Sequence, residues 1–590
     1  MLRRAPDRNL RDRSSPRPPS PGSRLAPELL AALVVLGAIF VGLGARALWN
    51  PVEPRYAGIA LRIADGGPWL VPEYEDLPYD QKPPLVFWFV AALHRLAGGE
   101  LNLFLVRLPS ALGALLGALG LVRLGRRHFG ARAGLWAGLV YGSSALVVWS
   151  GRFLHLDTLC AASLIWSLHA SLVAVDTRGP ARRRAIALAT AALALGLYTK
   201  GAPPLLFTAL TLAGTAPALR DRRVLTRAGL GWSLGGAFAL FLAWFLPAWA
   251  AMGHGWWREI LVEQGLSRLV SERPPRKHDA LYYLYSLLGA LTPWAPLLPF
   301  ALVAAVRALR SRGPARLEPA ARRGLVLALV WLLVTLVVLN LGETRRIRYL
   351  MVALPAAALL LGWYLDHAFA KAAGERNRLA PRLAAALAAL APAVLALLLA
   401  ALAFAGEAVA GRFRGAAAAV FRGLADSPLA IPIGVSALVL LVLAVRAVLA
   451  DRPLRALGHA TAILVLGWAF WGLVGAPAHD RHLDDEPLLA LVRPELAAGA
   501  ELWGIEGVAR RESAWGWYYA MTRRSIRVDD LSCEQVRAAV AAGRRVVLVR
   551  ERKKGETAPP EIEGMVRLNE KPVGRRASWV FADRGRSTAR

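Results

Sequence analysis

Length, composition and charge exclude most classes of soluble protein. The chain has 590 residues, of which 56% are hydrophobic and only 19% charged, and its formal net charge is +31. Soluble domains carry about 25% charged residues, so the apolar excess requires a non-aqueous solvent. The excess lies in long, nearly uncharged blocks such as 325–341 and 429–445, and about 20 apolar residues in a helix span a bilayer. The composition therefore predicts a polytopic membrane protein.

The basic residues are distributed in a way that favours a membrane topology over nucleic-acid binding. Only seven of the 72 basic residues are lysine, and the arginines gather between the hydrophobic blocks. Under the positive-inside rule, such basic loops stay on the cytoplasmic side. A nucleic-acid surface would instead collect basic residues along one face, so we expect no nucleic-acid partner. The two cysteines, Cys160 and Cys533, lie far apart and predict neither a disulfide framework nor a cysteine metal site.

Residues 1–26 are rich in arginine and proline, lack apolar periodicity and are predicted to form a disordered cytoplasmic tail. The first apolar block is longer than the core of a cleaved signal peptide, so we interpret it as an uncleaved span. With the N-terminus inside, an odd number of spans places the C-terminus outside. Thirteen spans are predicted, at 29–44, 103–122, 133–149, 156–174, 185–199, 201–218, 229–250, 286–306, 324–341, 349–366, 383–405, 428–445 and 458–474.

The stretch 83–98 is apolar but short, and it contains His94 and Arg95. If this stretch does not cross the membrane, the densest basic loops all fall on one side. If it does cross, every later loop inverts and the positive-inside rule fails. We therefore predict an amphipathic helix that lies in the membrane interface, within an external loop that covers residues 46–102.

The last 115 residues differ in kind from the rest of the chain. Three short strands are predicted at 501–505, 525–528 and 545–549, and a helix at 532–542 begins at a serine cap. Residues 476–590 are thus predicted to form a small periplasmic α/β domain, after a transmembrane domain at 27–475. We find no catalytic constellation in this domain and interpret it as a structural or acceptor-shaping lid.

Two residues of the first external loop combine charge with a fixed backbone. Glu53 precedes Pro54 at a predicted helix start, where an acid and a proline favour each other, so a purely structural role is one interpretation. The other is a carboxylate held at the membrane surface as a general base or cation ligand. Lys82 precedes two prolines, and its ammonium group could snorkel or could hold a lipid phosphate at headgroup depth.

Six short motifs occur on the predicted external side of the membrane. They are Glu53-Pro-Arg55-Tyr56-Ala, Tyr79-Asp80-Gln81-Lys82-Pro-Pro, Arg107-Leu-Pro109-Ser110, Arg152 through Asp157, Thr199-Lys200-Gly201 and Arg348-Tyr349-Leu350 running to Pro355. In these motifs the chain resembles the GT-C membrane glycosyltransferases, especially the bacterial aminoarabinose transferases of lipid A and the protein O-mannosyltransferases. The resemblance is clear over residues 28–370 and extends beyond them only in layout.

The resemblance implies an all-α GT-C bundle that takes a sugar from a polyprenyl-phosphate carrier. It passes the sugar, on the external face, to a lipid A, glycan or protein acceptor. Cations stabilise the leaving phosphate in such a transfer, and a carboxylate deprotonates or positions the acceptor. By resemblance, Lys82 would hold the donor phosphate. The other residues implied in substrate binding are Arg55, Tyr56, Asp80, Arg268, Arg345, Arg346 and Tyr349.

Glu53 and Asp157 are the predicted catalytic acids. Asp157 falls at the external end of a predicted span, where an ionised carboxylate is costly unless it works or is paired. The family usually has Asp-Glu where this chain has Val52-Glu53, so the acid most often assigned as catalytic is missing, and Gln81 stands where the family often has Glu. Both departures weaken any metal site, because a divalent cation needs several hard oxygen ligands. A divalent cofactor is left open without assigned ligands.

Three functions compete at this point. The first is glycosyl transfer, the second a transporter or flippase of polyprenyl-linked sugars, and the third a non-catalytic relative that binds the carrier. Transporters place ionisable residues and broken helices near the bilayer midplane, whereas the span interiors here are nearly free of charge. The sequence therefore favours chemistry at the membrane surface of a bacterial inner-membrane protein.

Overall fold

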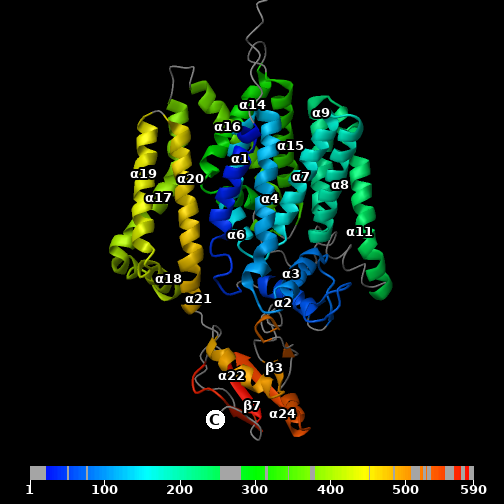
Figure 1. The fold of residues 1–590 in the computed structure, drawn as a ribbon, viewed down its shortest axis with the longest axis vertical. Helices are drawn as coiled ribbons and strands as arrows, with labels where there is room; N and C mark the ends of the chain where they lie inside the picture. The colour runs from blue at the N-terminus through cyan, green and yellow to red at the C-terminus, as the bar shows by residue number, and fades with distance from the viewer. Residues whose placement is uncertain are drawn as a thin grey trace, which may run out of the picture.

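The structure is a computed structural model, and Figure 1 shows a bundle of long helices with a small sheet-bearing region beyond one end. We call this end of the bundle the sheet end, and the opposite one the arginine end. The structure describes residues 21–48, 52–74, 77–252, 281–311, 317–342, 345–372, 379–450, 452–482, 486–505, 519–522, 526–527, 533–551, 562, 564–572 and 578–583.

The bundle confirms a helical multi-pass membrane protein. Seven of the described helices are long and apolar enough to cross a membrane, or eight if the bent pair α5–α6 counts as one span, so the number thirteen stays a prediction. The bundle helices are α1 (Pro21–Val35), α4 (Leu103–Phe129), α5 (Ala131–Ser143), α6 (Ala145–Gly151), α7 (Asp157–Asp176), α8 (Gly179–Lys200), α9 (Pro203–Leu219), α11 (Leu230–Met252), α13 (Tyr282–Ala290), α14 (Leu298–Arg310), α15 (Pro319–Leu341), α16 (Leu354–Ala372), α17 (Leu379–Ala410), α19 (Ala430–Leu449) and α20 (Pro453–Phe470).

Shorter helical elements link or extend these helices. They are the π-helical turns η1 (Leu36–Phe40) and η6 (Trp471–Gly475), the 3-10 turns η3 (Ala295–Leu297) and η5 (Ile347–Val352), and the helices α2 (Val52–Ala64), α3 (Leu85–Leu96), α10 (Arg223–Thr226), α18 (Gly415–Ala425), α21 (Ala476–His482), α22 (Glu486–Ala497) and α24 (Cys533–Ala541). Helix α18 lies between the predicted spans 383–405 and 428–445, in a segment for which we predict no helix.

Burial divides the bundle into a centre and a lipid-facing periphery. The apolar part of α7 is mostly buried, whereas α11 and α19 expose large apolar side chains such as Phe238 and Val439. A helix that is apolar all round belongs either in a core or in lipid. The peripheral helices in Figure 1 are therefore the ones that contact the bilayer.

Two predicted spans, 133–149 and 286–306, are broken in the structure. Ser144 has extended backbone between α5 and α6, and the two helices are bent by 61°. The N–H of Ala145 donates to the carbonyl oxygen of Thr292, in the break between α13 and η3. The indole of Trp294, 1% exposed, donates to Ser143 Oγ at 2.9 Å. Each break thus satisfies backbone groups of the other, as membrane-embedded irregular backbone requires.

Helices α2 and α3 lie at the sheet end, between the bundle and the C-terminal region (Figure 1). Helix α3 confirms a short helix where 83–98 is predicted, and it is too short for the span criterion. The two-residue strands β1 (Glu73–Tyr74) and β2 (Leu77–Pro78) pair antiparallel in the loop between α2 and α3.

The C-terminal region holds a five-stranded mixed sheet in the order β4-β3-β5-β7-β6. Strand β3 is parallel to β4 and β5, whereas β7 is antiparallel to β5 and β6. Alternate residues face opposite sides of a strand, so Trp503 and Leu548 pack near α24 while Leu502 and Val547 face the bundle side. The strands are β3 (Glu501–Ile505), β4 (Ile526–Arg527), β5 (Val546–Glu551), β6 (Met565–Arg567) and β7 (Ser578–Asp583).

One apolar core joins the C-terminal region to α2 and α3. Ile59 and Phe87 belong to the same buried cluster as Val492 of α22 and Val549 of β5. At its edge the Tyr519 hydroxyl donates to Asp65 Oδ2 at 3.0 Å. Burial of this apolar surface, at about 25 cal/mol per Å², fixes the sheet against the loop that carries the candidate site.

Candidate active site at the sheet end of the bundle

Glu53 lies at the start of α2 and is fully buried, with an exposed fraction of 0%. Arg107 Nε donates to Glu53 Oε1 at 2.8 Å, and Arg46 Nη1 donates to Oε2 at 3.0 Å. The N–H of Leu154 donates to the same carboxylate at 3.2 Å. Burial acts to raise the pKa of Glu53, but the charges of Arg107 and Arg46 outweigh it and hold the pKa at about 2. Glu53 is therefore ionised and engaged on both oxygens.

The arginines around Glu53 also satisfy irregular backbone. Arg107 donates to the carbonyl oxygens of Leu43 and Arg46, and Arg152 donates to those of Ala38 and Val41. These carbonyls belong to the end of η1 and the turn after it, where no helix continues to bond them. Burial lowers the pKa of Arg46 and of Arg152 to about 10. The Glu53 carboxylate thus compensates charge that the chain needs for its backbone.

A second acid–base pair, Asp157 with Lys200, joins the start of α7 to the end of α8. Lys200 Nζ donates to Asp157 Oδ1, and the ammonium group lies 5.3 Å from the ring centroid of Tyr349. The Asp157 side chain is 6% exposed and that of Lys200 17%. Arg348 and His155 also interact electrostatically with Asp157. We call Tyr56, Asp157, Lys200, Arg348 and Tyr349 the interface cluster.

Helix α4 holds the backbone before Asp157 in place. Ser110 Oγ donates to the carbonyl oxygen of His155 at 2.7 Å and accepts from the His155 N–H at 2.8 Å. A Cβ at Gly113 would lie 2.6 Å from the backbone nitrogen of Leu159, so only glycine permits this close approach of α4 to α7. The backbone is therefore held by α4 both before Asp157, at His155, and after it, at Leu159.

Tyr56 connects this pair to the loop that carries Lys82. Burial raises the pKa of Tyr56, while the charges of Arg348 and Arg55 act to lower it and Asp157 acts to raise it. The Tyr56 ring packs edge-on against Phe87 at 5.4 Å between centroids. Tyr56 thus lies on α2 between the Asp157–Lys200 pair and Arg55.

The side chains of Arg55 on α2 and Lys82 on the α2–α3 loop both donate to Gln81. Arg55 Nη1 donates to Gln81 Oε1 at 3.3 Å, and its guanidinium carbon lies 5.4 Å from the centre of the Tyr74 ring. Lys82 Nζ donates to the carbonyl oxygen of Gln81 at 2.7 Å. Both cations and Asp80 are half-buried. Lys82 is followed by two buried prolines and by the N-terminus of α3.

The remaining predicted contacts divide into described and undescribed ones. The Arg345 guanidinium donates to the carbonyl oxygen of Asn340 at 3.3 Å. Arg346 is exposed, and its backbone N–H donates to the Tyr283 hydroxyl. Tyr349 belongs to the interface cluster, where its ring lies beside the Lys200 ammonium group. Arg268 lies outside the described residues. Among the described residues no group of three His, Cys, Asp or Glu side chains gathers to hold a metal ion, so we derive no step through a divalent cation.

Sequence reasoning did not assign site roles to Arg46, Lys200 or Arg348. The available signal was position, because each is a cation at a predicted external helix end. The sequence also gives no structural role for Asp480, which follows the last predicted span at 458–474. Its Oδ2 accepts a hydrogen bond from the N–H of Ala47, so the end of the last span is tied to the loop before α2.

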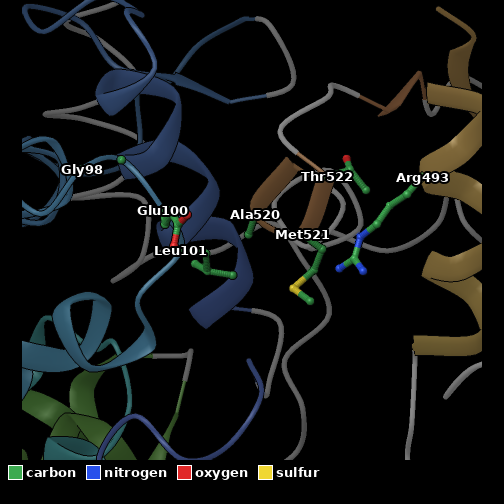
Figure 2. Close-up of a pocket in the computed structure, with 8 residues that line it drawn as sticks. Gly98, Glu100, Leu101, Arg493, Ala520, Met521 and Thr522 are labelled. Atoms are coloured by element: carbon green, nitrogen blue, oxygen red, sulfur yellow. The ribbon is translucent and has the colours of Figure 1, made fainter. Parts of the chain in front are cut away.

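A pocket of about 630 Å³ opens between the α3–α4 connection and the C-terminal region. Figure 2 shows Arg493 of α22 and Met521 on one side of it, and Glu100 and Leu101 on the other. The pocket therefore carries both charge signs beside an apolar lining.

The protein is thus a multi-pass helical bundle with buried charged residues at one end and a small sheet beyond that end. Solved structures with this fold are known. ArnT from Cupriavidus metallidurans bound to undecaprenyl phosphate superposes with a TM-score of 0.71 at 21% sequence identity, over 95% of this chain and 98% of that one. This likeness establishes the fold.

Sequence comparisons point to the same group. The family model described as dolichyl-phosphate-mannose-protein mannosyltransferase matches residues 81–250. Undecaprenyl phosphate-alpha-4-amino-4-deoxy-L-arabinose arabinosyl transferases from Shewanella sediminis and Pseudomonas paraeruginosa are 30% and 31% identical, over 59% of this chain and 61% of each relative. The chain thus spans about three fifths of the length of these relatives. The predicted resemblance to the GT-C membrane glycosyltransferases is confirmed.

The contacts of Glu53 predict a stability effect. Replacing Glu53 with Gln leaves Arg46 and Arg107 buried without a compensating charge, and breaking a buried pair in this way costs about 3–5 kcal/mol. We expect a clear drop in the thermal unfolding midpoint of the detergent-purified protein, measured by tryptophan fluorescence. The matched control is Glu73→Gln, which breaks a half-exposed pair with Arg62 and should cost only about 0–1 kcal/mol.

The acid limb of stability gives a second readout for the same variant. Because the folded-state pKa of Glu53 is about 2 instead of 4.5, its stabilising contribution is present above pH 4.5 and is lost as the pH falls toward 2. The difference between wild type and Glu53→Gln should therefore shrink over this pH range. A Glu53→Gln variant as stable as Glu73→Gln, but with greatly reduced turnover, would show that Glu53 serves catalysis instead.

Proposed function

We propose that this protein is a glycosyltransferase that moves a sugar from a polyprenyl-phosphate carrier to a lipid A, glycan or protein acceptor. The observation that carries the proposal is the charge around Tyr56 at one end of an ArnT-like bundle. Tyr56 of α2 interacts electrostatically with Arg55 and with the buried Asp157–Lys200 pair, and Arg55 and Lys82 both contact Gln81 of the α2–α3 loop. The names of the relatives support an undecaprenyl phosphate-linked sugar as donor. We take lipid A as the first acceptor to test.

The donor phosphate is assigned to Lys82 and Arg55. Both are half-buried. Lys82 lies just before the N-terminus of α3, whose positive end adds to its field, and Arg55 of α2 contacts the neighbouring Gln81. The Lys82 ammonium group donates to a backbone carbonyl and has three N–H donors, so it can also donate to a phosphate oxygen. Arg345, Arg346 and Arg268 are kept as further anion contacts, and Asp80 and Tyr349 as neighbours that orient the donor.

The acceptor is assigned to Asp157. In the proposed step the acceptor oxygen forms a bond to the anomeric carbon of the sugar and gives its proton to the Asp157 carboxylate. The bond between that carbon and the phosphate oxygen breaks, and the electron pair leaves with polyprenyl phosphate, whose charge Lys82 and Arg55 stabilise. Lys200 pairs with the Asp157 carboxylate before the step, and its positive charge favours passing the proton on after it.

Glu53 receives a different role in this proposal. Both of its oxygens are engaged by arginine, and its pKa of about 2 makes it a weak base. We therefore propose that Glu53 positions the turn before α2 and the segment before Asp157. Its predicted catalytic role stays a prediction, which the stability comparison above separates from a positioning role. Since Val52 replaces the usual acid, the carboxylate would come from α7 in this chain.

The proposed topology follows from where the charges lie. Thirteen crossings are proposed, one for each predicted span, with two of them broken and with α3 in the interface. Asp176 at the end of α7 pairs with Arg127 of α4 and Arg323 of α15, which supports a common arginine-rich end. We assign that end to the cytoplasm of an inner membrane, with residues 1–26, and the sheet end and residues 476–590 to the periplasm. Residues 27–475 then form the transferase domain.

The C-terminal region is proposed to shape the acceptor site. Its shared core with α2 and α3 fixes it beside the loop of Lys82. The pocket between Glu100 and Arg493 (Figure 2) opens on the same side, and a pocket with both charge signs suits an amphipathic, charged acceptor.

The rival function, transport of the lipid-linked sugar, gains one observation from the broken spans. Broken helices do mark transporter sites, but those sites carry ionisable residues or unwound carbonyls that line a cavity. Here the two breaks satisfy each other, and Trp294 fills the space beside Ser143. The charged groups lie at the helix ends instead, so we favour transfer over transport.

The topology is tested by cysteine labelling in intact cells. In a Cys533→Ser background, Ala97→Cys at the end of α3 should react with a membrane-impermeant maleimide. Arg183→Cys at the start of α8, which is also exposed, should react only after permeabilisation. The reverse pattern would invert the proposed orientation.

The phosphate assignment is tested by donor binding. Lys82→Ala should weaken binding of polyprenyl phosphate strongly, and Lys82→Arg should restore it only partly, because the guanidinium is broader than the point charge of an ammonium group. Binding can be followed by microscale thermophoresis with the purified protein. Wild-type affinity in correctly folded Lys82→Ala would refute the assignment.

The catalytic assignment is tested by transfer of a labelled sugar from polyprenyl phosphate. Asp157→Asn should lower turnover about 10²–10⁴-fold, the usual contribution of a general base, while donor binding persists. Val52→Asp, which restores the usual family acid, should raise turnover. Full activity of Asp157→Asn would refute its role, and absence of turnover in every variant despite donor binding would favour the non-catalytic relative.

A further inference from the structure

A groove opens between α4 and α7 at the arginine end of the bundle. It is lined by Arg123, Arg126, Arg127, His169 and Val173 and has a volume of about 510 Å³. Arg123 follows Arg107 by 16 residues on α4, so the groove lies about 24 Å along the helix from the Glu53 contacts. It is separate from the candidate active site.

The charges around the groove do not balance. Arg126 pairs with Glu28 at 2.9 Å, and Arg127 pairs with Asp176 at 2.5 Å. Asp176 is shared, because Arg323 Nη1 also approaches it at 2.7 Å. Counting the exposed Arg123, four arginines meet two carboxylates among these residues, which leaves two positive charges in excess.

Two buried polar atoms of the groove lack a hydrogen-bond partner among the described residues. They are Nδ1 of His169 and Nε of Arg127. Arg127 Nε is a donor, and His169 Nδ1 is one in the tautomer that carries the proton there. A buried donor without an acceptor costs free energy, and a ligand oxygen in the groove would supply that acceptor. The polar atoms therefore point to an anionic, oxygen-rich ligand.

Apolar and aromatic surface continues from the groove toward the bilayer. The Arg123 guanidinium carbon lies 5.3 Å from the centroid of the Trp166 ring, and that indole donates to the carbonyl oxygen of Leu116. Leu116 is 37% exposed and lies two helical turns from Arg123 on the same face of α4. An acyl chain can follow this face while a phosphate rests between the arginines.

We propose that this groove binds the headgroup of an anionic phospholipid. Its phosphate contacts Arg123, Arg127 and His169, and an acyl chain lies along Trp166 and Leu116. Basic pockets between spanning helices recognise acidic headgroups in this way, and each basic residue near the surface contributes to the attraction. The proposal does not depend on the sugar-transfer function.

The test uses the full-length protein in phosphatidylcholine nanodiscs doped with cardiolipin, with bound lipid counted by native mass spectrometry. Arg123→Gln should weaken cardiolipin retention roughly fivefold, and Arg123→Gln with Arg127→Gln roughly 25-fold. Arg183→Gln removes an exposed arginine from the same end of the bundle but outside the groove and should retain cardiolipin as wild type does.

The single variant keeps the test decisive if the double variant folds poorly, since Arg127 also pairs with Asp176 whereas Arg123 contacts an aromatic ring. Equal retention by wild type, Arg123→Gln and Arg183→Gln would overturn the proposal. A parallel arm adds inorganic phosphate to nanodiscs of pure phosphatidylcholine. If inorganic phosphate occupied the groove and displaced cardiolipin at comparable concentration, the groove would be a free-anion site and the lipid assignment would be wrong.

Discussion

The ion pairs of Glu53 with Arg46 and Arg107 are the constraint on which the sheet end depends. The chain leaves η1 as irregular backbone at the membrane surface, where unsatisfied carbonyls are costly. Arginine can donate five N–H groups in a fixed geometry, and Arg107 and Arg152 spend most of theirs on these carbonyls. Buried guanidinium groups require a counter-charge, and Glu53 supplies it. Four separate segments meet at this carboxylate.

The same segments carry the groups that we propose for the chemistry, so charges that hold the backbone and charges with a proposed catalytic role lie close together. Arg152 and Leu154 belong to the short connection that leads into Asp157, and Glu53 begins the helix that presents Arg55 and Tyr56. The acid with two arginine partners is rigid and a weak base. Asp157 accepts a hydrogen bond from one lysine, whose side chain is 17% exposed, and also interacts electrostatically with Arg348 and His155. The proposed roles follow this difference: Glu53 is the positioning acid, and Asp157 is the acid proposed to meet the acceptor.

Much of the fold follows from sequence periodicity, whereas the pairings do not. Hydropathy and charge predict the helical spans, the helix at 85–96 and the strand at 501–505, since each depends on residues close in sequence. Lys200 finds Asp157 across 43 positions, and only the packing of α7 against α8 brings them together. The break at Ser144 likewise depends on a contact distant in sequence, because the N–H of Ala145 donates to the carbonyl oxygen of Thr292. Glu53 read alone leaves both a structural and a catalytic role open, because its arginine partners lie on other elements.

Arginine serves two different ends in this chain, and burial decides between them. At the sheet end Arg46, Arg107 and Arg152 are buried, and their charge is directed at backbone carbonyls and one carboxylate. At the arginine end, Arg123 is exposed, and Arg127 and Arg323 share a single half-exposed acid. There the positive charge exceeds the negative charge, and in the proposed topology it faces the cytoplasmic leaflet, where acidic lipid is found. The net charge of +31 therefore combines two uses of arginine: buried arginines satisfy the backbone beside Glu53, and exposed arginines support the proposed orientation of the bundle.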